Sequence, residues 1–469
     1  MPDYKHDLPT NYYFGGGDEA TSATPMAVVV LLVAVGLMFV LPRKYAFVPF
    51  LIAVMLVPLH VVLILGGLHF NATRMLIIAG WLRVICRREY FPSQLGILDK
   101  LVFASALCNA IMYSVLWGDI GAVVNRLGIL LTTLGGYFLV RALVRNQEDI
   151  IRVIMALAVA AALIAPSMLY EHSHAYNPFW LLGAPEITNV RDGQIRAQGP
   201  FGHAITAGVV GAVLLPLFVG LIFEGRRVRL LAVGGVTASM AMIFASHSST
   251  PVLTLAAAIL GLAMWTARRN MRAVRWGVVL GLLVVQVGMT SPVWFIMDRA
   301  SGVMGGSGWH RAMLVDNFVR HFWEWWLYGT RANPDWGWSM WDVDNAYVGA
   351  GLSGGLLSFI LFIAILVYGF KIIGKGRRIA ENRRREARLI WLLGVALFAN
   401  AVAFFGIVYF DQAIVAWYAL LAMIATVPAF AAQESSATVK LTTALTPIEL
   451  HASPAHPVLR WHDHELGNL

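Results

Sequence analysis

The sequence predicts an all-α fold, a polytopic membrane helix bundle of about 12–13 transmembrane helices. Three observations lead to this prediction. Of the 469 residues, 58% are hydrophobic and only 13% are charged, which is about half the charge of ordinary soluble domains. Apolar runs of about 17–25 residues recur, each long enough to cross a hydrocarbon core of roughly 30 Å. The short alternating segments of a transmembrane barrel do not occur, so the runs are expected to be helices.

About thirteen apolar spans follow one another along the chain. They cover residues 26–41, 46–66, 70–85, 101–117, 120–140, 150–169, 204–223, 230–246, 251–267, 275–292, 345–370, 389–409 and 413–431. The third span is interrupted near its start by Asn71 and Arg74, so a re-entrant segment over 68–85 is the alternative. The spans together make up the transmembrane domain, residues 25–432.

Lysine and arginine gather in alternate connections between the spans, beginning with Arg43 and Lys44 after the first. The connection after the eleventh span is the most basic and contains Lys371, Lys375, Arg377, Arg378, Arg383, Arg384, Arg385 and Arg388. Short basic loops stay in the cytoplasm, so we expect the N-terminus outside and the C-terminus inside. The net charge of +9 then reflects membrane topology, and no nucleic-acid partner is expected.

Two tails and two long connections complete the predicted layout. Residues 1–24 are acidic and contain three consecutive glycines, which predicts a flexible external tail. Residues 433–469 are polar and proline-containing, which predicts a disordered cytoplasmic tail. The connections 170–203 and 293–344 face outside by the charge pattern. Function in a polytopic protein usually lies where such loops meet polar residues within the membrane.

The basic residues left on the predicted outer side are almost all arginine. They are Lys5, Arg74, Arg126, Arg191, Arg196, Arg299, Arg311, Arg320 and Arg331. A guanidinium group offers a planar fork of donors that matches phosphate oxygens and keeps its charge when buried. A cluster of them would suit a diphosphate carried on a lipid. The alternative is that each pairs with a nearby carboxylate, such as Asp192, Asp298 or Glu324, or extends to the membrane interface.

Arg126 lies inside the fifth span, a turn or two below the predicted outer surface. An arginine within the membrane is costly and indicates a functional site by default. A buried structural ion pair is the alternative.

Half of the 16 tryptophans fall within residues 294–341. They are Trp294, Trp309, Trp323, Trp325, Trp326, Trp336, Trp338 and Trp341. Apolar residues at helical spacing over 310–327 predict a helix at the outer interface. The indole rings could stack on sugars, but an aromatic belt at the level of the lipid headgroups is the favoured interpretation.

Histidine and acidic residues in the outer connections are candidate proton carriers. They are Glu171, His172, His174, Glu186, His203, Asp298, His310, Asp316, His321, Asp335, Asp342 and Asp344. None of them has the spacing of a zinc-ligand motif, and neither a P-loop nor a dinucleotide-binding motif occurs, so no metal or other cofactor is expected. The two cysteines, Cys86 and Cys108, are predicted to be free thiols.

Three short motifs occur in order among the spans. They are Arg196-Ala-Gln-Gly199-Pro-Phe201-Gly-His203, then Ser246-His-Ser-Ser249-Thr-Pro251, then a loop with Gly308-Trp-His310-Arg311 that ends in Asp344-Asn-Ala-Tyr347 and reaches Gly351 and Gly354-Gly355. In these motifs, and in their order over roughly 200–370, the chain resembles the O-antigen ligase and polysaccharide polymerase superfamily. It departs from the usual family pattern at Asp344, where ligases have histidine, and at His203, where many relatives have asparagine. The serine-rich turn also lacks the arginine that often follows it.

The resemblance implies a GT-C-like enzyme of the bacterial inner membrane that polymerises undecaprenyl-diphosphate-linked oligosaccharide repeat units into exopolysaccharide or O-antigen at the periplasmic face. Chain-length regulator and export proteins would be its partners, besides membrane lipid. The residues expected to be catalytic are Arg196, Arg311, Asp344 and His310. The residues expected to bind substrate are Arg126, His203, Arg320, Asn345, Tyr347 and Trp309.

Two other functions stay open. An O-antigen ligase would transfer the glycan to a lipid core or to a protein. A transporter of lipid-linked oligosaccharides would also use outward arginines, but it would show inverted repeats with broken helices in both halves, and the sequence shows no such symmetry.

Overall fold

The computed structural model describes residues 21–445 apart from 90–94, 189, 192 and 300–307. This part of the chain is mostly helical, and within it nine helices are long and apolar enough to cross a membrane. The fold is therefore an all-α polytopic bundle. Residues up to Ala431 form one compact unit, and Ala432 begins a second.

The first half of the bundle begins with three short helices. The helices and the π-helical segment of this half are α1 (Pro25–Val40), α2 (Arg43–Leu56), α3 (Ala72–Cys86), α4 (Ile97–Trp117), α5 (Ile120–Leu130), η2 (Leu131–Gly135), α6 (Gly136–Leu143) and α7 (Gln147–His174). Segments α5, η2 and α6 form one continuous span, in which η2 is a π-helical turn. Each predicted span of this half thus contains a helix.

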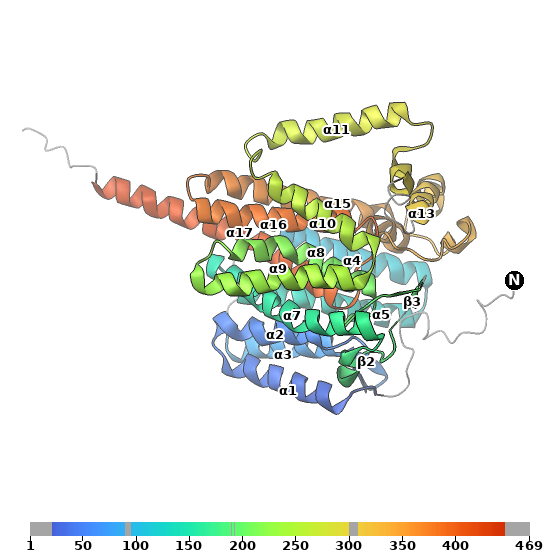
Figure 1. Ribbon diagram of the computed structural model, residues 1–469, viewed down its shortest axis with the longest axis horizontal. Coiled ribbons are helices and arrows are strands. Elements are labelled where there is room, and N and C mark those ends of the chain that lie inside the picture. Colours follow the sequence, from blue (N-terminus) through green and yellow to red (C-terminus); the bar gives the residue numbers. More distant parts are fainter. Residues whose placement is uncertain (1–20, 90–94, 189, 192, 300–307, 446–469) are drawn as a thin grey trace, which may run out of the picture. The chain divides into compact units, whose positions relative to one another are not determined.

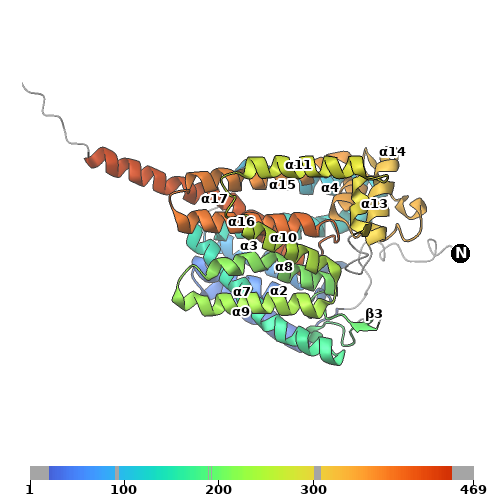
Figure 2. The same ribbon diagram turned by 45° about the horizontal axis from the view of Figure 1, so that its top comes forward.

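The second half contains the remaining helices. They are α8 (Ala204–Leu221), α9 (Arg226–Ser246), α10 (Ser249–Ala263), α11 (Met271–Gly288), α13 (Gly308–Arg320), α14 (Phe322–Trp325), α15 (Ala346–Ile379), α16 (Arg384–Ala403) and α17 (Asp411–Leu445). Helices α7, α8 and α9 pack side by side (Figure 2). Short 3₁₀ helices lie at Pro178–Leu182, Val293–Phe295 and Asn333–Trp336.

The second predicted span, 46–66, is wrong in about its second half. Helix α2 ends at Leu56, and a hairpin follows, in which β1 (Val62–Leu65) pairs with β2 (Leu68–Asn71). Pro58 disfavours a helical conformation in the residue before it. Gly66 and Gly67 both have positive φ, as a tight hairpin turn requires. A second, smaller hairpin joins β3 (Val190–Arg191) to β4 (Gln194–Ile195).

Parts of both predicted tails have secondary structure. Ser22 pairs with Val62 next to the first hairpin, and the hydroxyl of Thr24 caps α1. Residues 433–445 of the predicted C-terminal tail belong to α17. The rest of both predicted tails lies outside the described residues.

The two ends of the bundle differ in chemistry. At one end, here called the basic end, Arg385 pairs with Glu148 and Glu224, and Arg269 pairs with Glu381. The long connections lie at the opposite end, here called the loop end, where α13 and β3 are seen in Figure 1. The alternation of basic connections along the sequence therefore corresponds to a physical division of the bundle.

Helix α15 is broken near the loop end at Gly355, which has φ +70°. The amide of Thr330 donates to the carbonyl of Leu352 at 3.0 Å, and the amide of Leu356 donates to the carbonyl of Trp326 at 2.8 Å. The break leaves these backbone groups of α15 without hydrogen-bond partners inside the helix. Residues 326–330 of the long connection supply the missing hydrogen bonds.

Candidate functional site

The loop that carries the first motif is fixed by the buried carboxylate of Glu171. This carboxylate accepts hydrogen bonds from the amides of Gln198 (3.0 Å) and Gly199 (2.7 Å) and from the hydroxyl of Thr188 (2.9 Å). Gly199 has φ +58°, a conformation that a side chain would strain. Glu171, a candidate proton carrier from the sequence, thus positions the loop that begins at Arg196.

Two amide side chains hold the same loop from other elements. Asn177 donates to the carbonyl of Gly199 at 2.8 Å, and Gln412 of α17 donates to the carbonyl of Pro200 at 3.0 Å. The amide of Ala197 donates to the carbonyl of Ala245 at 3.0 Å, one residue before the second motif. The first two motifs are therefore in contact.

His203 ends the loop and caps α8, because its Nδ1 accepts a hydrogen bond from the amide of Ile205 at 3.2 Å. Burial lowers the pKa of His203, and the nearby charges of Arg196 and Arg191 lower it further, while Asp342 opposes them. His203 is therefore neutral near pH 7 and lies within electrostatic range of both Arg196 and Asp342.

The second and third motifs meet at Arg311. Its Nε donates to Oδ2 of Asp344 at 3.0 Å, and its Nη2 donates to the hydroxyl of Thr250 at 2.9 Å. Nε2 of His310 lies 3.7 Å from Oδ1 of Asp344 and 2.9 Å from the carbonyl oxygen of Asp342. We call these five residues the Asp344 cluster, and the charges of its Asp342 and of Arg196 both act on His203.

The carboxylate of Asp344 is only partly satisfied. Its Oδ1 is buried and has no hydrogen-bond partner among the described residues, and Nδ1 of His310 is in the same situation. Burial raises the pKa of Asp344 above its ordinary value, although Arg311 and His310 oppose that shift. An oxygen with a raised pKa and an unused acceptor position can take a proton from a bound hydroxyl group.

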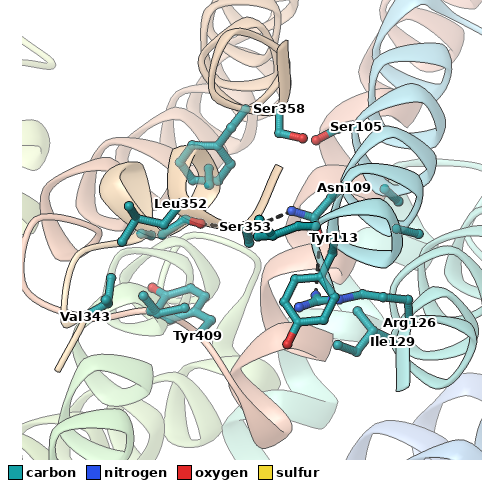
Figure 3. Close-up of a pocket in the computed structure, with 18 of the residues that line it drawn as sticks. Ser105, Asn109, Tyr113, Arg126, Ile129, Val343, Leu352, Ser353, Ser358 and Tyr409 are labelled. Carbon is teal, nitrogen blue, oxygen red and sulfur yellow. Dashed lines mark hydrogen bonds between the residues drawn. The ribbon is translucent and has the colours of Figure 1, made fainter. Parts of the chain in front are cut away.

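A cavity of about 1250 Å³ lies beside this cluster, between α4, α5, α15 and α17. Figure 3 shows Arg126 pointing into it from α5, toward Tyr113 and Asn109 of α4. Ser353 contributes from α15, where its hydroxyl accepts a hydrogen bond from Asn109 at 2.8 Å. We call this space the Arg126 cavity.

Arg126 has no carboxylate partner among the described residues. Its Nη1 donates to Oδ1 of Asn109 at 3.2 Å, its guanidinium lies 3.3 Å from the ring centroid of Tyr113, and its Nε is buried without a hydrogen-bond partner in the described part of the chain. The buried ion pair that was the alternative for Arg126 is therefore not found among the residues that the structure describes. A buried cation held by a ring and a neutral amide attracts an anion.

The cavity and the Asp344 cluster are neighbours but distinct. Two valines that line the cavity are close to the cluster. Val343 directly precedes Asp344 in the chain. Val408 lies two residues after Gly406, which adjoins Arg311. Arg196, Arg311 and Asp344 are not among the residues that line it. The predicted site residues thus fall into two adjacent sites instead of one.

Four other predicted site residues lie apart from both sites or serve the fold. Arg320 is 72% exposed and pairs with Asp316 at 2.6 Å, and Trp309 is also exposed. Asn345 caps α15 by accepting from the amides of residues 347 and 348, and Tyr347 donates to the carbonyl of Ala401 at 2.7 Å. Tyr347 and Asn345 therefore fix the start of α15.

Four residues of the two sites are not predicted from the sequence: Thr250, Asn109, Tyr113 and Ser353. Thr250 lies in the second motif, so its place beside Arg311 could have been suspected. Asn109 and Ser353 are polar residues within apolar runs, which is a general signal of function in membrane proteins. Their pairing with Arg126 across α4, α5 and α15 depends on the packing of the helices.

No group of three or more histidine, cysteine or acidic side chains that could hold a metal ion occurs in the described part of the chain. Both cysteines are free thiols, as predicted. Comparison with protein-family models and with curated proteins gives no match for this chain.

Proposed function

We propose that the chain is a bacterial inner-membrane glycosyltransferase that polymerises undecaprenyl-diphosphate-linked oligosaccharide repeat units at the periplasmic face. The observation that carries the proposal is the meeting of the second and third motifs in the Asp344 cluster, with the first motif hydrogen-bonded to the residue before the second, at the end of the bundle with the long connections. An unneutralised arginine lies in the adjacent cavity. Exopolysaccharide or O-antigen would be the product.

The cluster can perform glycosyl transfer with its own side chains. The hydroxyl of the acceptor sugar attacks the anomeric carbon of the donor and gives its proton to Asp344, with His310 orienting the hydroxyl. The bond between the anomeric carbon and the diphosphate oxygen breaks, and its electron pair stays on the diphosphate. Arg196 and Arg311 stabilise that charge. Arginine can supply the positive charge for this step without a metal ion.

The charge division of the bundle supports the proposed orientation. Basic connections remain in the cytoplasm, so the basic end would face the cytoplasm and the loop end the periplasm. With about thirteen membrane crossings, the N-terminus would be periplasmic and the C-terminus cytoplasmic. Lipid-linked saccharides would then reach the cluster from the outer leaflet, and chain-length regulator and export proteins would act on the same side.

The proposal is tested with purified protein in lipid nanodiscs and an undecaprenyl-diphosphate-linked oligosaccharide. Elongated chains are the expected result. Transfer only to an added lipid core or protein would assign a ligase instead, and an unchanged donor would remove the transferase proposal. Arg196→Ala and Arg311→Ala are expected to abolish elongation. Arg269→Ala, which loses an exposed arginine at the basic end, is the matched control and should keep it.

Loss of the partner of Asp344 could unfold the cluster, so Arg311→Lys is measured as well. Lysine keeps the charge beside Asp344 but cannot form the forked contact. We expect a folded protein with strongly reduced elongation. Wild-type elongation in both Arg196→Ala and Arg311→Lys would contradict the mechanism.

Among the described residues, the broken helix α15 is the feature that favours a transporter as second candidate. However, residues 326–330 bond the carbonyl of Leu352 and the amide of Leu356 at the break. These backbone groups are therefore occupied and do not face a substrate, which favours the transferase.

A further inference from the structure

We infer that the Arg126 cavity is a second prenyl-diphosphate site, in which Arg126 and Arg331 hold the diphosphate of the lipid-linked acceptor. The inference rests on the proposed function, because it assumes that a donor diphosphate occupies the Asp344 cluster. It assigns roles to Arg331, Tyr113, Trp117 and Asn109. The proposed glycosyl transfer at the Asp344 cluster uses none of these four residues.

Two arginine–aromatic stacks stand one above the other on α4. Arg126 lies 3.3 Å from the ring centroid of Tyr113, and Arg331 lies 4.0 Å from that of Trp117. Tyr113 and Trp117 are one helical turn apart, with ring centroids 5.8 Å from each other. Two guanidinium groups are thus presented in succession along one wall of the cavity, an arrangement suited to two linked phosphates.

The charge at this wall is not neutralised by the described residues. Within the described residues, neither Arg126 nor Arg331 forms an ion pair with a carboxylate, and Nε of Arg126 has no hydrogen-bond partner. Asp119 is the sole carboxylate among the described lining residues, and it accepts from the amide of Gly121 at 2.6 Å, which caps α5. An anion bound between the arginines would relieve the cost of burying their charge.

The lining of the cavity combines charged and apolar groups, as an amphiphile requires. Arg126, Arg331 and Asn333 line it together with the aromatic residues Phe362 and Trp417. Along α4 the lining extends from Trp117 to Ser105, about 18 Å by the helical rise. The volume of about 1250 Å³ exceeds the roughly 300–1,000 Å³ of pockets for small molecules. A diphosphate headgroup followed by a prenyl chain matches this profile.

The cavity suits the acceptor better than the donor. Its described lining contains no histidine, and its sole carboxylate is the cap of α5, so no group there is placed to take the proton of an attacking hydroxyl. The donor must break its bond to diphosphate at the Asp344 cluster. The attacking hydroxyl of the acceptor lies at the other end of its saccharide from its own diphosphate, so that diphosphate can bind in the neighbouring cavity.

The test compares two acceptors that carry the same saccharide, one linked to undecaprenyl diphosphate and one released from the lipid. Arg126→Ala, Arg126→Lys and Arg331→Ala are expected to lower transfer to the lipid-linked acceptor at least about tenfold. Transfer to the released saccharide, which also reports a folded protein, should stay within about twofold of wild type. Arg269→Ala should change neither. Equal losses with both acceptors, or no loss with either, would overturn the inference.

A binding measurement separates this inference from the proposed function. Native mass spectrometry should find two undecaprenyl diphosphate molecules per wild-type chain and one in the Arg126→Ala, Arg331→Ala double variant. That result supports the second site even if no transfer is detected. An unchanged number of bound molecules overturns it even if transfer is intact. Competition by inorganic diphosphate or phosphatidylglycerol at equal concentration would also overturn it, because the site would then lack selectivity for a prenyl diphosphate.

Discussion

At the residue scale, the outward arginines differ in whether a carboxylate neutralises them. Arg311 has Asp344 at 3.0 Å and Arg320 has Asp316 at 2.6 Å, whereas Arg126 contacts a ring and an amide. The sequence predicts that these arginines are unusual, because basic residues are disfavoured on that side. It does not predict which are paired, because Arg311 and Asp344 are brought together by folding across a long connection.

Asp344 is the residue whose titration the proposed chemistry depends on. Burial raises its pKa, so it loses its charge at a higher pH than an ordinary aspartate, whose pKa is about 3.9. A base must be deprotonated to act, so the rate of elongation should fall on acidification, with a midpoint above that value. Asp344→Asn should lower the rate by a factor of about 10²–10⁴. In this variant the residual rate of elongation should no longer fall on acidification with that midpoint, so the acidic limb of its pH–rate profile should be absent.

Arg311, His310 and Asp342 surround Asp344, and His310 is the other candidate base of the cluster. His310→Gln is therefore measured in parallel. If the acidic limb persists in Asp344→Asn and disappears in His310→Gln, the base is His310.

His203 links the pH to the stability of α8. Its folded-state pKa is lowered, chiefly by burial, so the unfolded chain binds the proton more readily. The stabilisation that neutral His203 gives the folded protein is complete above its pKa in the unfolded chain, about 6.5. This stabilisation is lost as the pH falls through the lower pKa that His203 has in the folded protein. The thermal unfolding midpoint should therefore fall on acidification from about pH 7 to 5. Asn also caps helices, so His203→Asn should keep the midpoint at neutral pH and show a smaller decrease. An identical decrease in both proteins would contradict this role.

At the element scale, the sequence locates the helices well and their irregularities poorly. Apolar runs place every expected span on a helix, because lipid requires the backbone to bond within the segment. The end of α2 at Leu56 could have been read from Pro58 and the glycine pair at 66–67. The break at Gly355 could not, because it depends on the long connection bonding to the helix at Leu352 and Leu356.

Gly355→Ala is expected to destabilise the protein by about 2 kcal/mol or more. An alanine at φ +70° is strained, and its Cβ would clash with the carbonyl oxygen of Leu327. Gly374→Ala in the same helix is the matched control, because nothing lies within 4 Å of its added Cβ; it should be neutral or stabilising. Thermal unfolding of the two variants in the same detergent measures the difference. Equal midpoints would show that the break tolerates a side chain.

At the scale of the whole molecule, the alternating charge of the connections is the most informative feature of the sequence. It predicts the two chemically different ends of the bundle, which the ion pairs of Arg385 and Arg269 now define. The Arg126 cavity could not be predicted, because Asn109, Arg126, Arg331 and Tyr409 come from segments whose neighbours are set only by packing.

The proposed orientation predicts which exposed positions a membrane-impermeant thiol reagent reaches. In a background with both native cysteines replaced, Trp338→Cys at the loop end should react in intact spheroplasts. Arg269→Cys at the basic end should react only after the membrane is opened. Both side chains are largely exposed, at 79% for Trp338 and 73% for Arg269, so burial does not explain a difference. The reverse pattern would place the Asp344 cluster in the cytoplasm.

The π-helical turn Leu131–Gly135 lies between two arginines of one membrane span. Arg126 points into the cavity on one side of it, and Arg141 pairs with the buried Asp99 at 2.9 Å on the other. Each residue of an α-helix advances the side-chain direction by about 100°, and a π turn changes this phase. Deleting one residue from the turn would therefore rotate one half of the span against the other. Either the cavity would lose the guanidinium group of Arg126, or the buried carboxylate of Asp99 would lose its ion pair with Arg141.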